Sequence, residues 1–437
     1  MAGASKPGDM STRRQRIAEL AKQSPQRGFT SLAHLIDIDW LYEAYRRTRR
    51  DGAPGVDGQT AQDYEADLAG NLQALLDRAQ SGTYRAPPVR RARIPKPGSP
   101  TETRPLGLPT FEDKVLQRAV ALVLEAVYEQ DFLDCSFGFR PGRSAHQALE
   151  ALRQQTMQMG GGWIVEVDIR KFFDTLDHAH LRDLLQLRVR DGVLLRLIGK
   201  WLNAGVLEDG DLSSPEAGTP QGGVISPLLS NIYLHALDRA FADGTHGRLV
   251  RYADDFVVMC RSRAQAEAAR GLAGRLLAEL GLELHPGKTK VVDLTYGREG
   301  LDFLGCHFRA RVSGRLLERG VRRCYLQRWP SQAAMKRVRQ KLKAKTGRGR
   351  AGEDIREVIA DLNPILRGWG NYFRTGNAAQ KFVHIDRYAE RRLRGLMRKR
   401  YGRHLRPGQS ATWTREWFEA HGLYRLRGTI RYPAPAS

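Results

Sequence analysis

Three aspartates stand where the sequence otherwise predicts buried strands. The stretch RYADDFVV (251–258) places Asp254 and Asp255 between apolar residues, and IVEVDIRKFF places Asp168 after an alternating run. An unpaired carboxylate is costly to bury in a sheet. The sequence therefore leaves two interpretations of the Asp-Asp pair: either it lies in the exposed turn of a hairpin, or a divalent metal ion neutralises it.

Carboxylates at the end of one strand and at the turn of a hairpin are the minimum set for holding two hard cations. Mg²⁺ takes oxygen ligands and keeps water or substrate phosphate in its remaining positions. Two such ions hold the attacking and leaving oxygens of an in-line phosphoryl displacement. A Tyr-x-Asp-Asp tetrapeptide alone is weak support, because composition produces it in roughly one in a few tens of chains this long. Side chains alternate along a strand, so Asp254 and Asp255 share one site only if the turn bends.

The composition favours a polyanionic partner. The 437 residues include 71 Lys and Arg against 48 Asp and Glu, a formal net charge of +23. Nucleic acid is the commonest partner of such a chain, and a basic surface kept for solubility is the alternative. Four widely spaced cysteines predict reduced thiols. No signal peptide or membrane-length apolar stretch is visible, so we expect a soluble, intracellular protein without membrane contact.

The pattern of elements predicts an α+β chain with a helical appendage. Residues 1–30 are polar and basic, and we expect them to be loosely ordered. Helical periodicity begins at Ser31 and is strongest from Phe111, while seven prolines between 84 and 110 predict extended chain. Strand patterns recur at 161–173, 248–260 and 302–308, and a basic helical module follows residue 315. Mixed helices and hairpins followed by helices alone are typical of the α+β class.

Several segments, taken together and in order, resemble a known family. Asp168 with Phe173, the PQGG segment and YADD look like the palm of a reverse transcriptase. The wider set of sequence motifs is similar to one branch of these enzymes, the group II intron reverse transcriptases, also called maturases. The resemblance extends from about residue 11 to about residue 400. The matching segments are GAPGVDG (52–58), IPKPGSPTETRPLGLPT (94–110), FGFRPGRSAHQAL (137–149), VDIRKFFDTLDH (167–178), AGTPQGGVISPLLSNIYLHALD (217–238), RYADDFVV (251–258), LELHPGKTKVV (282–292), DFLGCHF (302–308) and LNPILRGWGNYFR (362–374).

The resemblance implies a right-hand polymerase fold with four parts. These are a basic N-terminal extension (1–30), fingers and palm (31–310), a helical thumb or maturase domain (315–400) and a short basic DNA-binding tail (401–437). The last segment has no cysteine and its histidines lack metal spacing, so we expect no C-terminal endonuclease. This resembles the bacterial lineage that ends in a short DNA-binding tail, and such a protein would need a DNA primer supplied from elsewhere.

The resemblance also implies roles for individual residues. It implies that two Mg²⁺ ions, with Mn²⁺ as a substitute, are held by the catalytic Asp168, Asp254 and Asp255 together with the backbone of Ile169. The nucleotide-binding residues would be Lys96, Arg104, Phe173, Gln221 and Lys288. The template and primer would contact Arg140, Arg143, Phe303, Leu304, Gly305 and Arg367. In the family, the aromatic residue matching Phe173 leaves no room for a ribose 2′-hydroxyl.

Simpler interpretations of these residues stay open. Lys96, Arg104 and Lys288 could be solvated loop cations. One of the two neighbours Phe172 and Phe173 belongs to the core. Residues 303–305 could be strand packing, and Trp369 and Phe373, four apart, could be the core contact of one helix.

The function implied is an RNA-directed DNA polymerase that also binds its intron RNA and promotes splicing and mobility by target-primed reverse transcription. The partners would be group II intron RNA, an RNA template–DNA primer duplex, target DNA and deoxynucleoside triphosphates. The expected location is cytoplasmic, associated with the nucleoid when DNA is bound. The alternatives are a splicing maturase or RNA chaperone without polymerase activity, and a domesticated enzyme of DNA repair or phage defence.

Overall fold

The computed structural model describes residues 7–95, 103–208, 211–213, 218, 222–295, 297–312, 318–320 and 324–432. Lys96 and Gln221, two of the predicted nucleotide-binding residues, lie outside these ranges. The chain forms two compact units. The first comprises Met1–Pro95, Thr101–Ala151 and Ile164–Val291, and the second comprises Lys96–Pro100, Leu152–Trp163 and Val292–Ser437.

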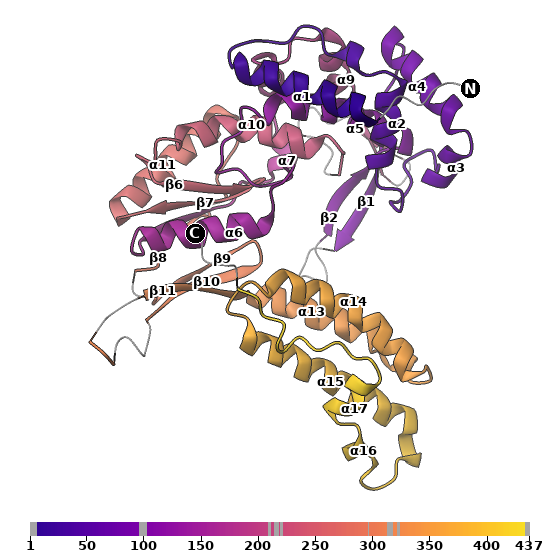
Figure 1. The fold of residues 1–437 in the computed structure, drawn as a ribbon, viewed down its shortest axis with the longest axis vertical. Coiled ribbons are helices and arrows are strands. Elements are labelled where there is room, and N and C mark those ends of the chain that lie inside the picture. Colours follow the sequence, from indigo (N-terminus) through magenta and orange to yellow (C-terminus); the bar gives the residue numbers. More distant parts are fainter. Residues whose placement is uncertain are drawn as a thin grey trace. The chain divides into compact units, whose positions relative to one another are not determined.

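Helices dominate the N-terminal part of the first unit. They are α1 (Pro7–Gln23), a 3₁₀ turn (Ala33–Leu35), α2 (Ile38–Arg47), α3 (Ala61–Glu65), α4 (Leu68–Ser81) and α5 (Phe111–Tyr128). Figure 1 shows α1 and α2 lying against α5. The expectation that residues 1–30 are loosely ordered was wrong for α1. Ile17 and Ala21 are 5% and 0% exposed, so this helix has an apolar face that packs like any other.

Two sheets complete the first unit. One has the strand order β2-β1-β4-β5, with β1 (Val89–Pro95), β2 (Thr103–Leu108), β4 (Val206–Glu208) and β5 (Asp211–Ser213). The other has the order β6-β7-β3-β8, with β3 (Trp163–Val167), β6 (Arg248–Tyr252), β7 (Asp255–Cys260) and β8 (Lys290–Asp293). Helices α10 and α11 lie along one face of this second sheet (Figure 1). The helices around it are α6 (Ala145–Gln158), α7 (Phe172–Thr175), α8 (His178–Gln186), α9 (Gly192–Leu202), α10 (Ser226–Ala240) and α11 (Arg263–Glu279).

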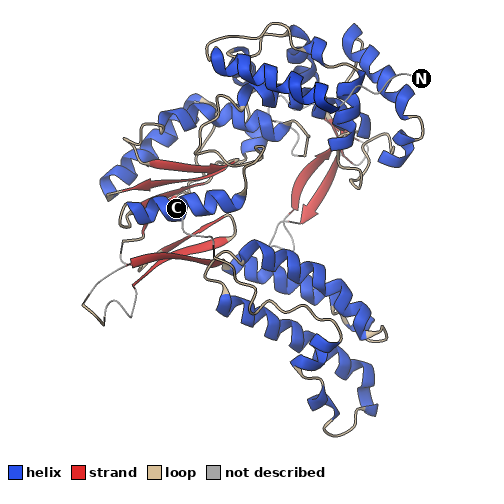
Figure 2. Cartoon of the chain, in the orientation of Figure 1, coloured by secondary structure: helices blue, strands red, loops and turns tan. Residues whose placement is uncertain are grey.

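The second unit combines a small sheet with a helical module (Figure 2). Its sheet has the order β11-β10-β9, with β9 (Gly300–Phe303), β10 (Cys306–Val312) and β11 (Cys324–Pro330). The helices are α13 (Gln332–Lys345), α14 (Ile355–Phe373), α15 (Ala379–Tyr401), α16 (Gln409–Thr412) and α17 (Arg415–Ala420), with 3₁₀ turns at Arg348–Arg350 and Gly402–His404. The Trp369 ring lies 5.0 Å from that of Phe373 and 5.4 Å from that of Phe382, which supports the core interpretation of these aromatics.

The α+β prediction is confirmed: helices and sheets with antiparallel pairings, apart from the parallel pair β1–β4, are followed by a helical region. Within the described ranges, no helix has both the length and the apolar character needed to cross a membrane.

Candidate active site

The hairpin β6–β7 carries the Asp-Asp pair at its turn. Tyr252 pairs with Asp255, so Ala253 and Asp254 form a two-residue turn. Ala253 has a φ of 57°, in the region that non-glycine residues rarely adopt. Asp254 is half-buried in the turn, while Asp255 begins β7 and retains solvent access. The pair therefore stands at a hairpin turn, and this turn bends the chain as a shared site for both acids requires.

Asp168 comes from the neighbouring strand of the same sheet. It follows β3, which lies beside β7 in the strand order. Its carbonyl accepts a hydrogen bond from the amide of His285 (2.8 Å), and the amide of Arg170 donates to the carbonyl of Glu283 (2.9 Å). These two bonds flank Ile169, so the bridge between Ile169 and Leu284 does not use the Ile169 carbonyl predicted as a metal ligand.

The carboxylates influence one another electrostatically. Although Asp255 retains solvent access, partial loss of the water around its carboxylate raises its pKa to about 6, and the negative charges of Asp254 and Asp168 add to the effect. Burial, followed by the charge of Asp168, also raises the pKa of Asp254. The positive charge of Arg104 on β2 opposes both increases, so this predicted nucleotide-binding residue lies within electrostatic reach of the pair. Groups that raise one another's pKa favour a cation between them.

The carboxylates of Asp168, Asp254 and Asp255 suit a hard divalent cation in chemistry, although their side chains do not point at one common position. Among the described residues, no three His, Cys, Asp or Glu side chains are grouped closely enough to hold a metal ion. Lys288 Nζ lies 3.0 Å from Asp168 Oδ2, where its ammonium group neutralises one of the carboxylates. Carboxylate oxygens are the ligands that Mg²⁺ takes. The three aspartates therefore fit Mg²⁺ by chemistry, and binding requires that they turn toward the ion and that Lys288 give up this contact.

Two neighbouring phenylalanines near Asp168 have different surroundings. Phe172 is 2% exposed and is the core residue of the pair. Phe173 is half-buried on the short helix α7, and its ring lies edge-on to that of Phe172 at 5.1 Å. Phe173 is therefore the one with a surface that can face a substrate.

Arg140 does not fit its predicted role in binding template. Its side chain is 4% exposed and pairs with the carboxylate of Glu129 at 3.0 Å. Its Nη1 donates to the carbonyls of Leu133 (2.7 Å) and Ser136 (2.8 Å). All three guanidinium nitrogens are engaged, so Arg140 stabilises its own loop. Arg143 is 29% exposed and pairs with Asp134, which leaves part of it accessible to a phosphate.

The predicted primer-contacting segment forms the tight turn between β9 and β10. Phe303 is 4% exposed, so the prediction that its side chain contacts primer does not fit. Leu304 and Gly305 have φ values of 47° and 76° and remain partly exposed. Tyr372 Oη donates to the Leu304 carbonyl at 2.8 Å, which ties the turn to α14. Arg367 on α14 is exposed and lies 5.2 Å from the centroid of the Tyr424 ring.

The structure adds residues that the sequence interpretation missed. Arg251, immediately before the YADD motif, is 0% exposed and forms an ion pair with Asp238 on α10. It also donates to the carbonyl of Ala253 at 2.9 Å. A Cβ added to Gly138 would lie 2.3 Å from the amide nitrogen of Ala253, so this glycine allows close approach to the turn. A charged residue within the apolar run LVRYADD was the available signal, because a buried charge requires a partner.

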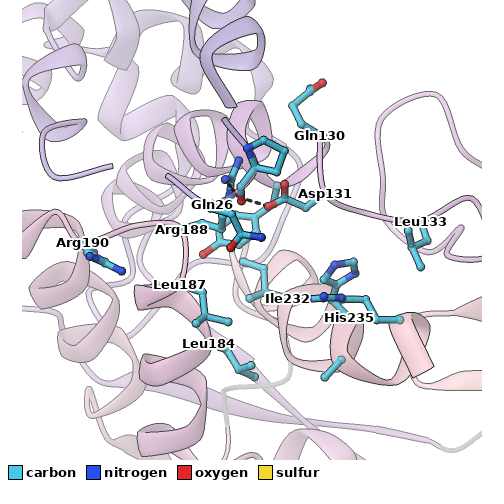
Figure 3. A pocket seen from close by; sticks show the side chains of 14 residues that line it. Gln26, Gln130, Asp131, Leu133, Leu184, Leu187, Arg188, Arg190, Ile232 and His235 are labelled. Carbon is cyan, nitrogen blue, oxygen red and sulfur yellow. Dashed lines mark hydrogen bonds and ion pairs between the residues drawn. The ribbon is translucent and has the colours of Figure 1, made fainter. Parts of the chain in front are cut away.

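Each unit also has a hollow that none of the three aspartates lines. The first, of about 500 Å³, is lined by the end of α5, by α8 and by α10. Figure 3 shows its ion pair between Arg188 and Asp131 and, on the α10 side, His235. The second, of about 420 Å³, lies between α13, α14 and the β9–β10 turn, with Arg337 and Lys341 among its lining residues.

Comparison with known families agrees with this arrangement. Residues 94–308 match the family described as "Reverse transcriptase (RNA-dependent DNA polymerase)". Residues 335–413 match "Group II intron, maturase-specific domain". The chain is therefore of the reverse transcriptase class. It carries an Asp-Asp pair on a hairpin, an aspartate at the end of the neighbouring strand, and a helical region after them.

Individual relatives narrow this class. The chain is 36% identical over 337 residues to Protein YkfC of Escherichia coli strain K12, covering 68% of this chain and 87% of that protein. It is 40% identical over 230 residues to the group II intron-encoded protein LtrA of Lactococcus lactis subsp. cremoris, covering 52% of this chain and 37% of LtrA. An uncharacterised 91 kDa protein in the cob intron of Schizosaccharomyces pombe is 29% identical over 425 residues, covering 80% of this chain and 50% of that protein. The chain belongs to the group II intron reverse transcriptase and maturase family, as its motifs indicated. Reverse transcriptases as a family use divalent metal ions and nucleic acid substrates.

Proposed function

We propose that this protein is an RNA-directed DNA polymerase that also binds its group II intron RNA. The observation that carries the proposal is the grouping of Asp168 with the Asp254–Asp255 turn on adjacent strands, within electrostatic reach of Arg104. Polymerisation needs a cluster of carboxylates for metal and cations for the triphosphate. Here both kinds of group lie within electrostatic reach of one another.

The primer 3′-hydroxyl would attack the α-phosphate of a deoxynucleoside triphosphate and release pyrophosphate. When bound, two Mg²⁺ ions would supply activation of the hydroxyl and neutralisation of the leaving group. Asp168, Asp254, Asp255 and the Ile169 carbonyl would hold them. Arg104 and Lys288 would orient the triphosphate, together with Lys96 and Gln221, which lie outside the described residues. Phe173 would lie against the sugar and exclude a 2′-hydroxyl.

The remaining parts of the chain would bind RNA and DNA. We assign fingers and palm to residues 31–310, the thumb or maturase domain to 315–400, and flanking basic segments to 1–30 and 401–437. The match of residues 335–413 to the maturase-specific domain supports intron binding and splicing. The net charge of +23 supports contacts with nucleic acid phosphates. Through such contacts the protein would carry out target-primed reverse transcription in the bacterial cytoplasm, at the nucleoid.

The test is extension of a DNA primer on an RNA template with Mg²⁺ and deoxynucleotides, comparing the wild type with Asp254→Ala. Asp183→Ala is the control, because this carboxylate is exposed and belongs to α8, not to the hairpin. We expect extension by the wild type and the control, and none by Asp254→Ala. If no protein extends the primer while the wild type still promotes splicing of a structured intron RNA, the protein is a splicing maturase only.

A further inference from the structure

Arg251 and Asp238 form a fully buried ion pair directly beneath the YADD turn. Both side chains are 0% exposed. Arg251 Nε donates to Asp238 Oδ1 at 2.7 Å, and Nη2 donates to Asp238 Oδ2 at 2.5 Å, a two-point contact between β6 and α10. A bidentate pair of this kind fixes the orientation of the guanidinium plane as well as its position.

Arg251 also donates to three other residues: one more on α10, one in the turn and one in a loop. Its Nη1 donates to the carbonyl of Ala253 (2.9 Å) and to Asn231 Oδ1 (2.9 Å). Its Nη2 also donates to Ser136 Oγ at 2.8 Å. Ala253 is the residue before Asp254 and has the positive φ of the turn. One guanidinium therefore links a helix, a loop and the backbone on which the aspartates stand.

The opposite side of the turn is held by the loop that contains Ser136. The amide of Arg251 donates to the Cys135 carbonyl (2.8 Å), and the amide of Phe137 donates to the Arg251 carbonyl (2.9 Å). Asn231 Nδ2 donates to the Gly138 carbonyl at 2.7 Å. Gly138 in turn approaches Ala253 so closely that no side chain fits between them. The turn is thus held between Gly138 and the Arg251 guanidinium.

Stability alone is a poor explanation for such a pair. Removing two charges from water is costly, and well-packed apolar residues of similar volume often serve as well or better. What an apolar pair lacks is a donor aimed at one carbonyl. Two links connect the pair to the site: the direct contact with the Ala253 carbonyl and the hydrogen bonds that run through Asn231 to Gly138.

We propose that Arg251, anchored on Asp238, is a positioning residue for the metal-binding aspartates, holding the β6–β7 turn in the conformation that presents Asp254 and Asp255 to the cation. The inference rests on the proposed polymerase function for its kinetic readout. It predicts that the guanidinium fork, and not the positive charge alone, is required. A lysine at 251 would still neutralise Asp238, but one ammonium cannot reach Asp238, Ser136 and Ala253 together.

The test compares Arg251→Lys with Arg188→Lys. Arg188 is a matched control, because it is also buried (6% exposed), pairs with Asp131 and donates to backbone carbonyls. Those carbonyls belong to residues 21–27, not to the hairpin. Single-nucleotide primer extension is measured against Mg²⁺ concentration, and hydrogen exchange is measured on the peptide spanning the turn without metal.

For Arg251→Lys we expect kcat to fall by about 10- to 100-fold, the range seen when outer-shell partners of metal ligands are removed. The half-saturating Mg²⁺ concentration should rise, the KM for template–primer should stay unchanged, and the turn peptide should exchange faster. Arg188→Lys should lose thermal stability to a similar extent without any of these changes. The proposal is overturned if the two variants behave alike in Mg²⁺ dependence and in exchange at the turn.

Two further outcomes are distinguishable. If Arg251→Lys does not fold, Asn231→Ala keeps the ion pair and removes the link between Arg251 and Gly138. It should then shift the Mg²⁺ dependence and turn exchange in the same direction, and no shift in either refutes the positioning role. If the wild type itself does not polymerise, the proposed function fails, and hydrogen exchange at the turn still decides the inference about Arg251.

Discussion

Gly138→Ala tests whether the position of the turn controls activity. An added Cβ would lie 2.3 Å from the amide nitrogen of Ala253 and 2.9 Å from the carbonyl carbon of Tyr252. Cβ atoms essentially never approach other heavy atoms within 3.0 Å, so the turn or the loop must move by at least about 0.7 Å. The obstructing atoms are backbone, which cannot swing aside as a flexible side chain can.

The expected loss follows from that displacement. A misplacement of about 1 Å in catalytic groups costs about 10²-fold in rate, so we expect kcat to fall between about 10- and 100-fold. The overpacking itself should cost about 1–3 kcal/mol of folding free energy. Primer extension under saturating template–primer and thermal unfolding measure the two effects.

Gly199→Ala is the matched control. Gly199 lies inside α9, and a Cβ there would meet nothing within 4 Å. Alanine is the better helix former by about 0.5–1 kcal/mol, so the control should be slightly more stable and fully active. Unchanged kcat in a folded Gly138→Ala protein would show that the turn tolerates displacement, and the reasoning from its packing would be refuted.

Three further predictions concern charge. Because loss of water and neighbouring carboxylates raise the pKa of Asp255 to about 6, protons compete with metal below that pH, and the half-saturating Mg²⁺ concentration should rise as the pH falls through about 6. Without metal, the folded protein binds the Asp255 proton more tightly than the unfolded chain does, so ionisation of Asp255 lowers the stability of the fold as the pH rises from about 4 through about 6. Asp255→Asn should therefore raise the melting temperature at pH 8 and not at pH 4. Equal shifts at both pH values would contradict the raised pKa of Asp255. Because Lys288 Nζ lies 3.0 Å from Asp168 Oδ2, Lys288→Gln should raise the KM for nucleotide and lower the half-saturating Mg²⁺ concentration in steady-state extension, and a higher Mg²⁺ requirement would argue against competition at that carboxylate. Arg337 and Lys341 line the second hollow, beside α14. Replacing both with Gln should reduce the slope of log affinity for template–primer against log salt by about 1.5, because each phosphate that is no longer neutralised contributes about 0.7–0.9. An unchanged slope would show that the duplex binds elsewhere.

Local patterns in the sequence predicted the elements that carry the chemistry. Apolar runs around Asp168 and Asp254 predicted the strand end and the hairpin that the structure shows. These predictions succeeded because alternation and turn formation depend on residues close together in the chain. The sequence motifs also indicated the family, because motifs are recognised from residues that are neighbours in the chain and require no knowledge of tertiary contacts.

Side-chain environment was less predictable. Arg140 and Phe303 stand in motifs that predicted substrate contact, yet both are buried, with 7% and 4% of the residue exposed. Residues before about 30 looked too polar to order, but α1 uses Ile17 and Ala21 to pack on α5. Whether a side chain faces a substrate or the interior depends on elements far away in the sequence, which no local pattern specifies.

By itself, the sequence determined the class of protein, the acids at the strand end and at the turn, and the basic character that suits nucleic acid. Only the tertiary structure decided what holds those acids in place. Arg251 meets Asp238, 13 residues away, and Ser136, 115 residues away. A buried charge must find its partner in space, because protein interior replaces the water that would otherwise solvate it. The partner is therefore set by which helices and loops pack against the turn.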